Sequence, residues 1–188
     1  LKQKHALLKV APYTHSYPHC WRSKTPVIAR ALPQWFIHLD DLKKKAEKAI
    51  DHVQWMPDWG KKRISGSVAA RPDWGISRQR TWGIPLPVYF DDQCEALLDA
   101  EVIARIADKI AQHGTQWWFE NNEETLLEGI SLPEAWRNKH LKKSQDTLDV
   151  WIDSGCSHVS VLEANGWEPA GLYLEGSDQH RGWFQSPL

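Results

Sequence analysis

Apolar residues between positions 39 and 53 recur at spacings of three and four, the period that places side chains on one face of an α-helix. Charged residues, mostly lysines, fill the positions between them. The pattern therefore predicts an amphipathic helix with one buried face. That face consists of Leu39, Leu42, Ala46, Ala49 and Val53. The lysines on its other faces are Lys43, Lys44, Lys45 and Lys48.

Further elements are predicted on both sides of this helix. Aromatic and β-branched residues favour a short strand over 33–38, and a second helix over 61–70 should end before Pro72. Residues 86–90 are predicted to form a strand with its proline near the start. A third helix is expected over about 101–113.

The last part of the chain has an α/β pattern. Residues 147–152 are predicted to form a strand, 156–164 a helical turn or two, and 172–174 a short apolar strand. A glycine turn and a helix from Asp178 to the end of the chain follow. A strand, a glycine turn and a helix in that order place polar residues at the carboxyl edge of a parallel sheet, where open α/β folds bind ligands. The expected fold class is therefore α/β.

The net charge of −1 conceals an uneven distribution. Residues 1–90 carry 16 lysines and arginines against 6 acidic residues, whereas residues 91–128 carry 2 against 10. The basic half could face a polyanion such as tRNA, or its lysines could simply be a solvated helix face. Charge favours the two interpretations equally.

Composition excludes several classes of protein. No apolar run approaches the ~20 residues of a membrane-spanning helix, and no secretory signal is present at the start, so the cytoplasm is the expected location. Cys20, Cys94 and Cys156 are too few for a disulfide framework. Because the chain starts at Leu1 and its one methionine is Met56, we expect an internal piece of a longer protein.

Four groups of residues together resemble the isoleucyl-tRNA synthetase family, which belongs to the class I aminoacyl-tRNA synthetases. They occur in the family's order over most of the chain, and only 91–145 lacks them. The related valine enzyme is the alternative, but the last group resembles the isoleucine form. The groups are 15–22 (HSYPHCWR) with 34–36 (QWF), 74–85 (WGISRQRTWGIP), 149–155 (DVWIDSG) and 173–184 (YLEGSDQHRGWF).

The resemblance implies a Rossmann-like catalytic domain with an inserted α+β lobe. Residues 1–90 would form the connection that returns from the family's editing insertion, 91–145 an acidic inserted lobe, and 146–188 the start of the second half of the nucleotide-binding fold. The family's HIGH-type and KMSKS-type phosphate motifs do not occur in this sequence. We therefore expect the isolated chain to be inactive.

The resemblance also implies the reaction of the parent enzyme, which would be a monomer. Isoleucine attacks ATP, accompanied by Mg²⁺, to form isoleucyl-adenylate, which then acylates tRNA(Ile) in translation. Neither step needs a protein nucleophile, so no catalytic side chain is assigned. Alternative interpretations are a non-catalytic tRNA-binding module, an inert structural fragment and a piece of the valine-type enzyme.

The resemblance places the adenylate site at residues 175–179. Glu175 matches the position that contacts the aminoacyl-adenylate, and Gly176 lets the backbone and nucleoside approach each other. Asp178 matches the ribose-binding acid, and Gln179 would face the amino acid. Asp178 could instead only cap the following helix, although the resemblance favours binding.

Trp82 and Trp183 match positions that line the isoleucine side-chain pocket, where flat apolar walls suit the ligand. The sequence has 12 tryptophans, so aromatic character alone supports no assignment.

No metal site is predicted. Cys20 and Ser23 form a C-x-x-S pattern where some family members have C-x-x-C, and zinc would need a second pair of thiolates. We expect well below one zinc ion per chain. The remaining candidate ligands are four histidines that are not paired at the spacing of metal ligands on a helix, and they are interpreted as structural or solvent-facing. They are His15, His19, His158 and His180.

Overall fold

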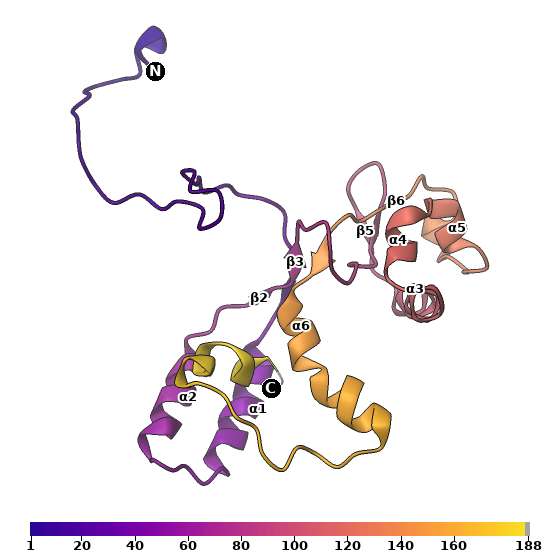
Figure 1. Ribbon diagram of the computed structural model, residues 1–188. Helices are drawn as coiled ribbons and strands as arrows, with labels where there is room; N and C mark the ends of the chain where they lie inside the picture. The colour runs from indigo at the N-terminus through magenta and orange to yellow at the C-terminus, as the bar shows by residue number, and fades with distance from the viewer. Residues whose placement is uncertain (187–188) are drawn as a thin grey trace. The chain divides into compact units, whose positions relative to one another are not determined.

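The computed structural model describes residues 1–186, and the chain divides into two units, Leu1–Pro33 and the residues from Gln34 onward (Figure 1). The first unit is mostly extended after a short 3₁₀ helix, η1 (Lys2–Lys4). Its one tight turn is closed by hydrogen bonds from the Cys20 amide to the Thr25 carbonyl and from the Lys24 amide to the Cys20 carbonyl, each 2.8 Å long. Residues 15–22 form a loop whose one isolated bridge joins His19 to Pro26.

The second unit begins with a helical hairpin, α1 (Asp40–Asp51) and α2 (Trp59–Ala69). Both helices were predicted. Their shared core contains Ala46, Ile50, Ile64 and Val68. The connection between the helices is held by Trp55, whose Nε1 donates to the Ile50 carbonyl at 3.0 Å. The hairpin is thus stabilised by apolar contacts along one stripe of each helix.

The buried face of α1 differs in part from the prediction. Leu39 and Ala46 are buried, but Leu42, Ala49 and Val53 are exposed, and Ile50 is buried in their place. Residues spaced by three or by four both line up along a helix, so the sequence pattern allows more than one buried row of side chains. The position of α2 decides which of these rows is buried. The row that faces α2 runs through Ala46 and Ile50.

Short antiparallel strand pairs connect the hairpin to the rest of the unit. Strand β1 (Phe36–Ile37) pairs with β2 (Trp74–Gly75), and β3 (Ser77–Arg78) pairs with β7 (Thr147–Leu148). The predicted strand over 33–38 is therefore confirmed for its Phe36–Ile37 portion.

A three-stranded sheet forms one side of a separate hydrophobic cluster. Strand β4 (Tyr89–Phe90), predicted within 86–90, lies between β5 (Ala96–Leu97) and β6 (Lys142–Lys143). The helices of this cluster are α3 (Ala100–His113), α4 (Gln116–Glu120), α5 (Glu123–Leu127) and the 3₁₀ helix η2 (Glu134–Trp136).

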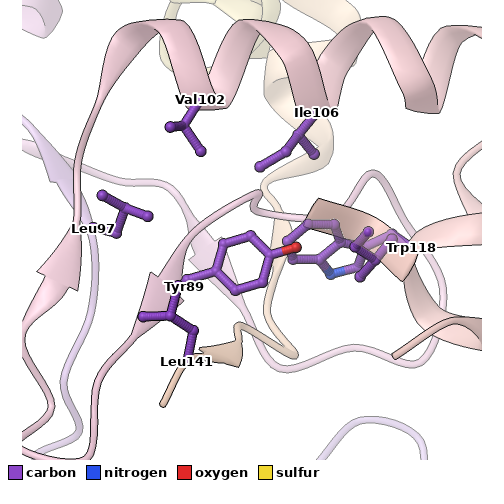
Figure 2. Close-up of a cluster of buried hydrophobic side chains, with 7 residues drawn as sticks. Tyr89, Leu97, Val102, Ile106, Trp118 and Leu141 are labelled. Carbon is purple, nitrogen blue, oxygen red and sulfur yellow. The ribbon is translucent and has the colours of Figure 1, made fainter. Parts of the chain in front are cut away.

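Figure 2 shows the buried side chains of this cluster, which come from both the sheet and the helices. Tyr89 meets Trp118 edge to face, with ring centroids 5.4 Å apart. The third predicted helix is confirmed as α3, and its first turn is capped by Asp99, whose carboxylate accepts from the amides of Glu101 and Val102. Residues between Tyr89 and Leu141 therefore share a hydrophobic core, to which strand β4 contributes from outside the acidic segment. That core consists of Tyr89, Leu97, Val102, Ile106, Trp118, Leu126 and Leu141.

The prediction of a strand over the whole of 147–152 is wrong. Only β7 is extended, and Val150 begins helix α6 (Val150–Gly155). The Asp149 carboxylate accepts the Trp151 amide at 3.3 Å, so this residue caps the helix and stops the strand. The predicted helical segment after Cys156 is confirmed as η3 (His158–Leu162) and η4 (Glu163–Asn165).

The strand predicted over 172–174 is also wrong. Leu172 and Leu174 are exposed, and this stretch has no regular structure. The helix expected from Asp178 is present as two 3₁₀ helices, η5 (Ser177–Arg181) and η6 (Trp183–Gln185), and the last two residues of the prediction lie outside the described ones.

Mixed helix and strand content agrees with the predicted α/β class, but the expected parallel sheet is not formed in residues 1–186. Every strand pair there is antiparallel. A strand forms only beside a partner that satisfies its backbone groups, and 172–174 has none alongside it in the described residues. No helix among these residues is long and apolar enough to cross a bilayer.

Replacing Tyr89 by phenylalanine should leave the free energy of unfolding unchanged or raise it by up to about 1 kcal/mol. The Tyr89 hydroxyl is buried without a hydrogen-bond partner in the described residues, and burial raises its pKa well above the usual value. Urea denaturation followed by tryptophan fluorescence measures the change. As a control, Ile106→Ala in the same core should lower stability by about 2–5 kcal/mol. A loss above about 1 kcal/mol for Tyr89→Phe would show that a bound water or other partner satisfies the hydroxyl.

Candidate substrate-binding site

Most of the predicted site residues lie where the irregular stretch after Tyr173 enters helix η5. Glu175 is exposed and makes no side-chain hydrogen bond within residues 1–186. Gly176 precedes the helix with an extended backbone, φ −71° and ψ 158°. A Cβ at this position would lie 2.5 Å from Oδ1 of Asp178. Glycine therefore allows the Asp178 carboxylate to lie directly over the backbone.

The side chain of Gln179 connects both ends of this short helical region. Its Nε2 donates to Asp178 Oδ2 at 3.2 Å, and its Oε1 accepts the Trp183 amide at 2.9 Å. The Asp178 carboxylate accepts no hydrogen bond from a backbone amide in the described part of the chain. Asp178 therefore does not cap the helix in this structure. Asp178 is oriented by Gln179 and keeps acceptor capacity for a ligand.

The two predicted pocket tryptophans have different environments. Trp183 is stacked on Tyr173, with ring centroids 3.7 Å apart and an interplanar angle of 13°. Trp82 lies in a turn with 87% of its surface exposed. No aromatic contact joins the two tryptophans among the described residues, and the isoleucine pocket that the resemblance implies for them stays a prediction.

Three contacts fix the end of this segment against the helices. Phe184 packs against the core of the α1–α2 hairpin. Arg71, just after α2, donates from Nη1 to the Gln185 carbonyl at 2.7 Å. Gly155, the last residue of α6, lies so close to Ser186 that an added Cβ would be 2.5 Å from its carbonyl oxygen. The candidate site is therefore held from two directions.

A half-buried ion pair joins two of the motif segments, 74–85 and 149–155. Arg78 Nη2 lies 2.7 Å from Asp149 Oδ2, and Trp74 Nε1 donates to the same oxygen at 2.9 Å. The Asp149 amide donates to the Ile76 carbonyl at 2.7 Å. Asp149 is only 5% exposed, so its charge depends on these partners.

A second polar network joins the QWF segment to the same region. Ser77 Oγ accepts the Trp35 amide at 2.9 Å and donates to Gln34 Oε1 at 3.1 Å. Gln79 Nε2 donates to Asp146 Oδ1, also at 3.1 Å. Residues that are more than forty positions apart in sequence are thus brought together by hydrogen bonds.

The Arg71 guanidinium and the Asp149 carboxylate attract each other near the site. Burial lowers the pKa of the Arg71 guanidinium, and the nearby Asp149 carboxylate opposes that shift. Arg71 also lies over the Trp74 ring, with its guanidinium carbon 4.9 Å from the ring centroid. Two guanidinium groups, those of Arg71 and Arg78, therefore face one buried carboxylate.

The Cys20 thiol is the candidate metal ligand in the turn that begins at this residue. A hydrogen bond from the Ser23 side chain lowers the pKa of the Cys20 thiol, and the backbone of Ser23 and Arg22 adds to the effect. No group of three or more His, Cys, Asp or Glu side chains that could hold a metal ion occurs in residues 1–186. The expectation of substoichiometric zinc stays a prediction.

Sequence reasoning missed the roles of Arg78 and Asp149. Both lie in segments that carried the family resemblance, but no side-chain pairing can be inferred from one sequence when the partners are 71 positions apart. The available signal was that the charges of 74–85, Arg78 and Arg80, are all positive and those of 149–155, Asp149 and Asp153, are all negative.

Comparison with known proteins gives matches along the whole chain. The sequence profile of the family described as "tRNA synthetases class I (I, L, M and V)" matches residues 9–188. The isoleucine–tRNA ligase of Methylacidiphilum infernorum is 52% identical over 188 residues, and that of Aquifex pyrophilus 50% over 198. The isoleucine–tRNA ligase of Methylococcus capsulatus is 54% identical over 194 residues. Each alignment covers all of this chain but only 20%, 37% and 20% of the respective relative.

Replacing Arg78 by methionine should lower the free energy of unfolding by about 3 kcal/mol. The change removes the direct ion-pair partner of the buried Asp149 carboxylate. The attraction to Arg71 remains and Arg78 is partly accessible to water, so the loss should lie at the lower end of the usual range. Chemical denaturation measures it. The matched control is Lys44→Met, which breaks the exposed Lys44–Asp41 pair and should cost less than about 1 kcal/mol. Equal effects of the two substitutions would contradict the structural role of Arg78.

Replacing Gly155 by alanine should destabilise the segment from Ser177 to Ser186, because the new Cβ would meet the Ser186 backbone. We expect an overall loss of about 1–3 kcal/mol and faster amide hydrogen exchange in that segment. Gly66→Ala is the matched control, since Gly66 lies in a helix with open space beside it and alanine should stabilise by about 0.5–1 kcal/mol. A neutral Gly155→Ala would contradict the close contact.

Proposed function

Because the chain belongs to the class I tRNA synthetases for isoleucine, leucine, methionine and valine, we propose that it is part of an isoleucine–tRNA ligase and contributes to its synthetic site. The observation that carries the proposal is identity of about half the residues, along the entire chain, to proteins named isoleucine–tRNA ligase. The same observation favours the isoleucine enzyme over the valine type. The whole enzyme would use isoleucine, ATP and tRNA.

The proposed chemistry requires positioning and not a protein nucleophile. The isoleucine carboxylate attacks the α-phosphate of ATP and pyrophosphate leaves. A ribose hydroxyl at the 3′ end of tRNA then attacks the adenylate carbonyl, and AMP leaves. The protein must hold the reacting groups in line and place donors and acceptors around them. The exposed polar groups of residues 175–179 suit this task.

Each of these residues has a defined part in the proposal. Glu175 accepts hydrogen bonds from the ammonium or hydroxyl groups of the adenylate, since its carboxylate has no partner in the described protein. Asp178, oriented by Gln179, accepts the ribose hydroxyls. Gly176 lets the nucleoside approach the backbone, and Trp183, stacked on Tyr173, offers a flat wall to the amino-acid side chain.

The proposal also divides the chain into three parts of the whole enzyme. Residues 1–90 would connect an editing insertion to the catalytic domain, 91–145 would be an inserted lobe, and 146–188 would begin the second nucleotide-binding half. The independent core around Trp118 supports the lobe, although it also includes Tyr89. Mg²⁺ would accompany ATP, and since the described residues form no metal-binding group, no step is assigned to a protein-held ion.

Replacing Glu175 by alanine in the longer ligase that contains this segment should lower kcat/KM for isoleucine-dependent ATP–pyrophosphate exchange roughly ten- to a hundredfold, through loss of a charge-assisted hydrogen bond. The melting temperature should stay unchanged because Glu175 is exposed and unpaired in residues 1–186. Pyrophosphate exchange and thermal melting of the same variant test this.

The matched control for Glu175→Ala is Glu168→Ala, which removes another exposed carboxylate outside the segment and should leave exchange normal. Normal exchange with a lowered melting temperature in Glu175→Ala would contradict the binding role. An unmodified ligase without isoleucine-dependent exchange would overturn the proposed function itself.

A further inference from the structure

The residues proposed to bind the adenylate, from Glu175 to Gln179, lie in a segment whose two ends are stacked on each other. Tyr173 precedes these residues and Trp183 follows them. The two rings lie nearly parallel, with centroids 3.7 Å apart and an interplanar angle of 13°. The stack therefore closes the chain over 173–183 into a loop that carries the candidate site.

The Trp183 end of this loop is fixed to the helical hairpin. The Trp183 amide donates to Gln179 Oε1 at 2.9 Å, and its indole meets the Phe184 ring edge to face, with centroids 6.0 Å apart. Phe184 packs against the core of the α1–α2 hairpin, and Arg71 binds the carbonyl of the next residue, Gln185. Trp183 is thus a fixed support on which a second ring can stack.

The Tyr173 end of the loop has no comparable support. No backbone amide over 168–175 donates a hydrogen bond within residues 1–186. Leu172 and Leu174, the neighbours of Tyr173, are exposed. The stack on Trp183 is therefore the contact through which this end of the loop is held, and Glu175 lies only two residues further along the chain.

The Tyr173 hydroxyl is not needed for the stack. It makes no hydrogen bond within residues 1–186, and 47% of the surface of Tyr173 is exposed. Stacking depends on the aromatic ring, so phenylalanine would keep the contact and an aliphatic residue of similar size would lose it. Because the ring is not part of a buried core, its loss should affect the geometry of the loop more than the stability of the fold.

The stack also determines which face of the Trp183 indole is open to a ligand. Tyr173 covers one face of the indole, so an amino-acid side chain can pack only against the other. The ribose side of the site is held in a different way. Asp178 is oriented by Gln179, which is itself held by the backbone amide of Trp183 and not by the indole.

We propose that Tyr173 is a positioning residue for the amino-acid side of the site, a role that rests on the proposed function. By stacking on Trp183 it sets the plane of the wall against which the isoleucine side chain packs. The same contact holds the chain that leads to Glu175, which accepts hydrogen bonds from the adenylate. Tyr173 itself touches no reacting atom.

The test compares substitutions of Tyr173 in the longer ligase, measured by isoleucine-dependent ATP–pyrophosphate exchange. Tyr173→Leu should raise KM for isoleucine about three- to tenfold, the size of effect expected from the loss of one aromatic stack. KM for ATP should change less than about twofold, because Asp178 and Gln179 do not depend on the stack. Tyr173→Phe should behave as the unmodified enzyme, and thermal melting checks that each variant is folded.

A second measurement asks whether Tyr173 acts through Trp183. In a ligase that already carries Trp183→Leu, the further change Tyr173→Leu should alter KM for isoleucine less than about twofold, because the ring on which Tyr173 stacks is absent. The matched control is Leu172→Ala, which removes an exposed apolar side chain from the same stretch and should leave both KM values unchanged.

The proposal would be overturned by an unchanged KM for isoleucine in Tyr173→Leu, by equal rises of both KM values, or by an equal effect of Leu172→Ala. Additive effects of Tyr173→Leu and Trp183→Leu would also overturn it. So would a Tyr173→Phe enzyme as impaired as Tyr173→Leu, which would assign the effect to the hydroxyl. All of these outcomes leave exchange by the unmodified ligase intact, whereas absence of that exchange would overturn the proposed function and this role together.

Discussion

The arrangement of the second unit depends on satisfying one buried carboxylate, that of Asp149. An ionised carboxylate in this environment is stable only if donors surround it, and here Arg78, the Trp74 indole and the Trp151 amide supply them. Because these donors come from β2, β3 and α6, the three elements must meet at this point. The same residue ends strand β7 and starts α6, so the direction of α6 is set there as well.

The position of the candidate site depends on the same contacts around Asp149, because they set the direction of α6. Helix α6 ends at Gly155, which contacts the Ser186 backbone, while Arg71 binds the neighbouring Gln185 carbonyl from the other side. Phe184 adds an apolar anchor in the α1–α2 core. Residues 177–186 are thus held by side-chain and backbone contacts to elements far away in sequence. A segment without a regular α-helix or strand of its own can still present Asp178 and Gln179 in a fixed geometry.

Sequence patterns predicted the helices better than the strands, for a physical reason. The hydrogen bonds of α1, α2 and α3 are local, so periodicity and caps such as Asp99 suffice to indicate them. A strand needs a partner, and the apolar run at 172–174 has none in the described residues. The apolar residues after Asp149 were equally compatible with a helix, and the capping carboxylate decides between the two. Likewise, the row of α1 side chains that is buried depends on packing against α2. The sequence pattern of α1 alone carries no information on that packing.

The distinction between architectural and ligand-binding residues follows from which polar groups are already satisfied. The family resemblance singled out the segments of Asp149 and of Glu175 alike, but it assigned a ligand-binding role only to residues of the second segment. In the structure the Asp149 carboxylate is saturated by protein donors and buried, which leaves it little capacity for a ligand. Glu175 has no partner among the described residues and Asp178 has only Gln179. An unsatisfied charge that is exposed to water costs little and gains most from a complementary ligand, which supports the proposal that Glu175 and Asp178 are the residues that bind one.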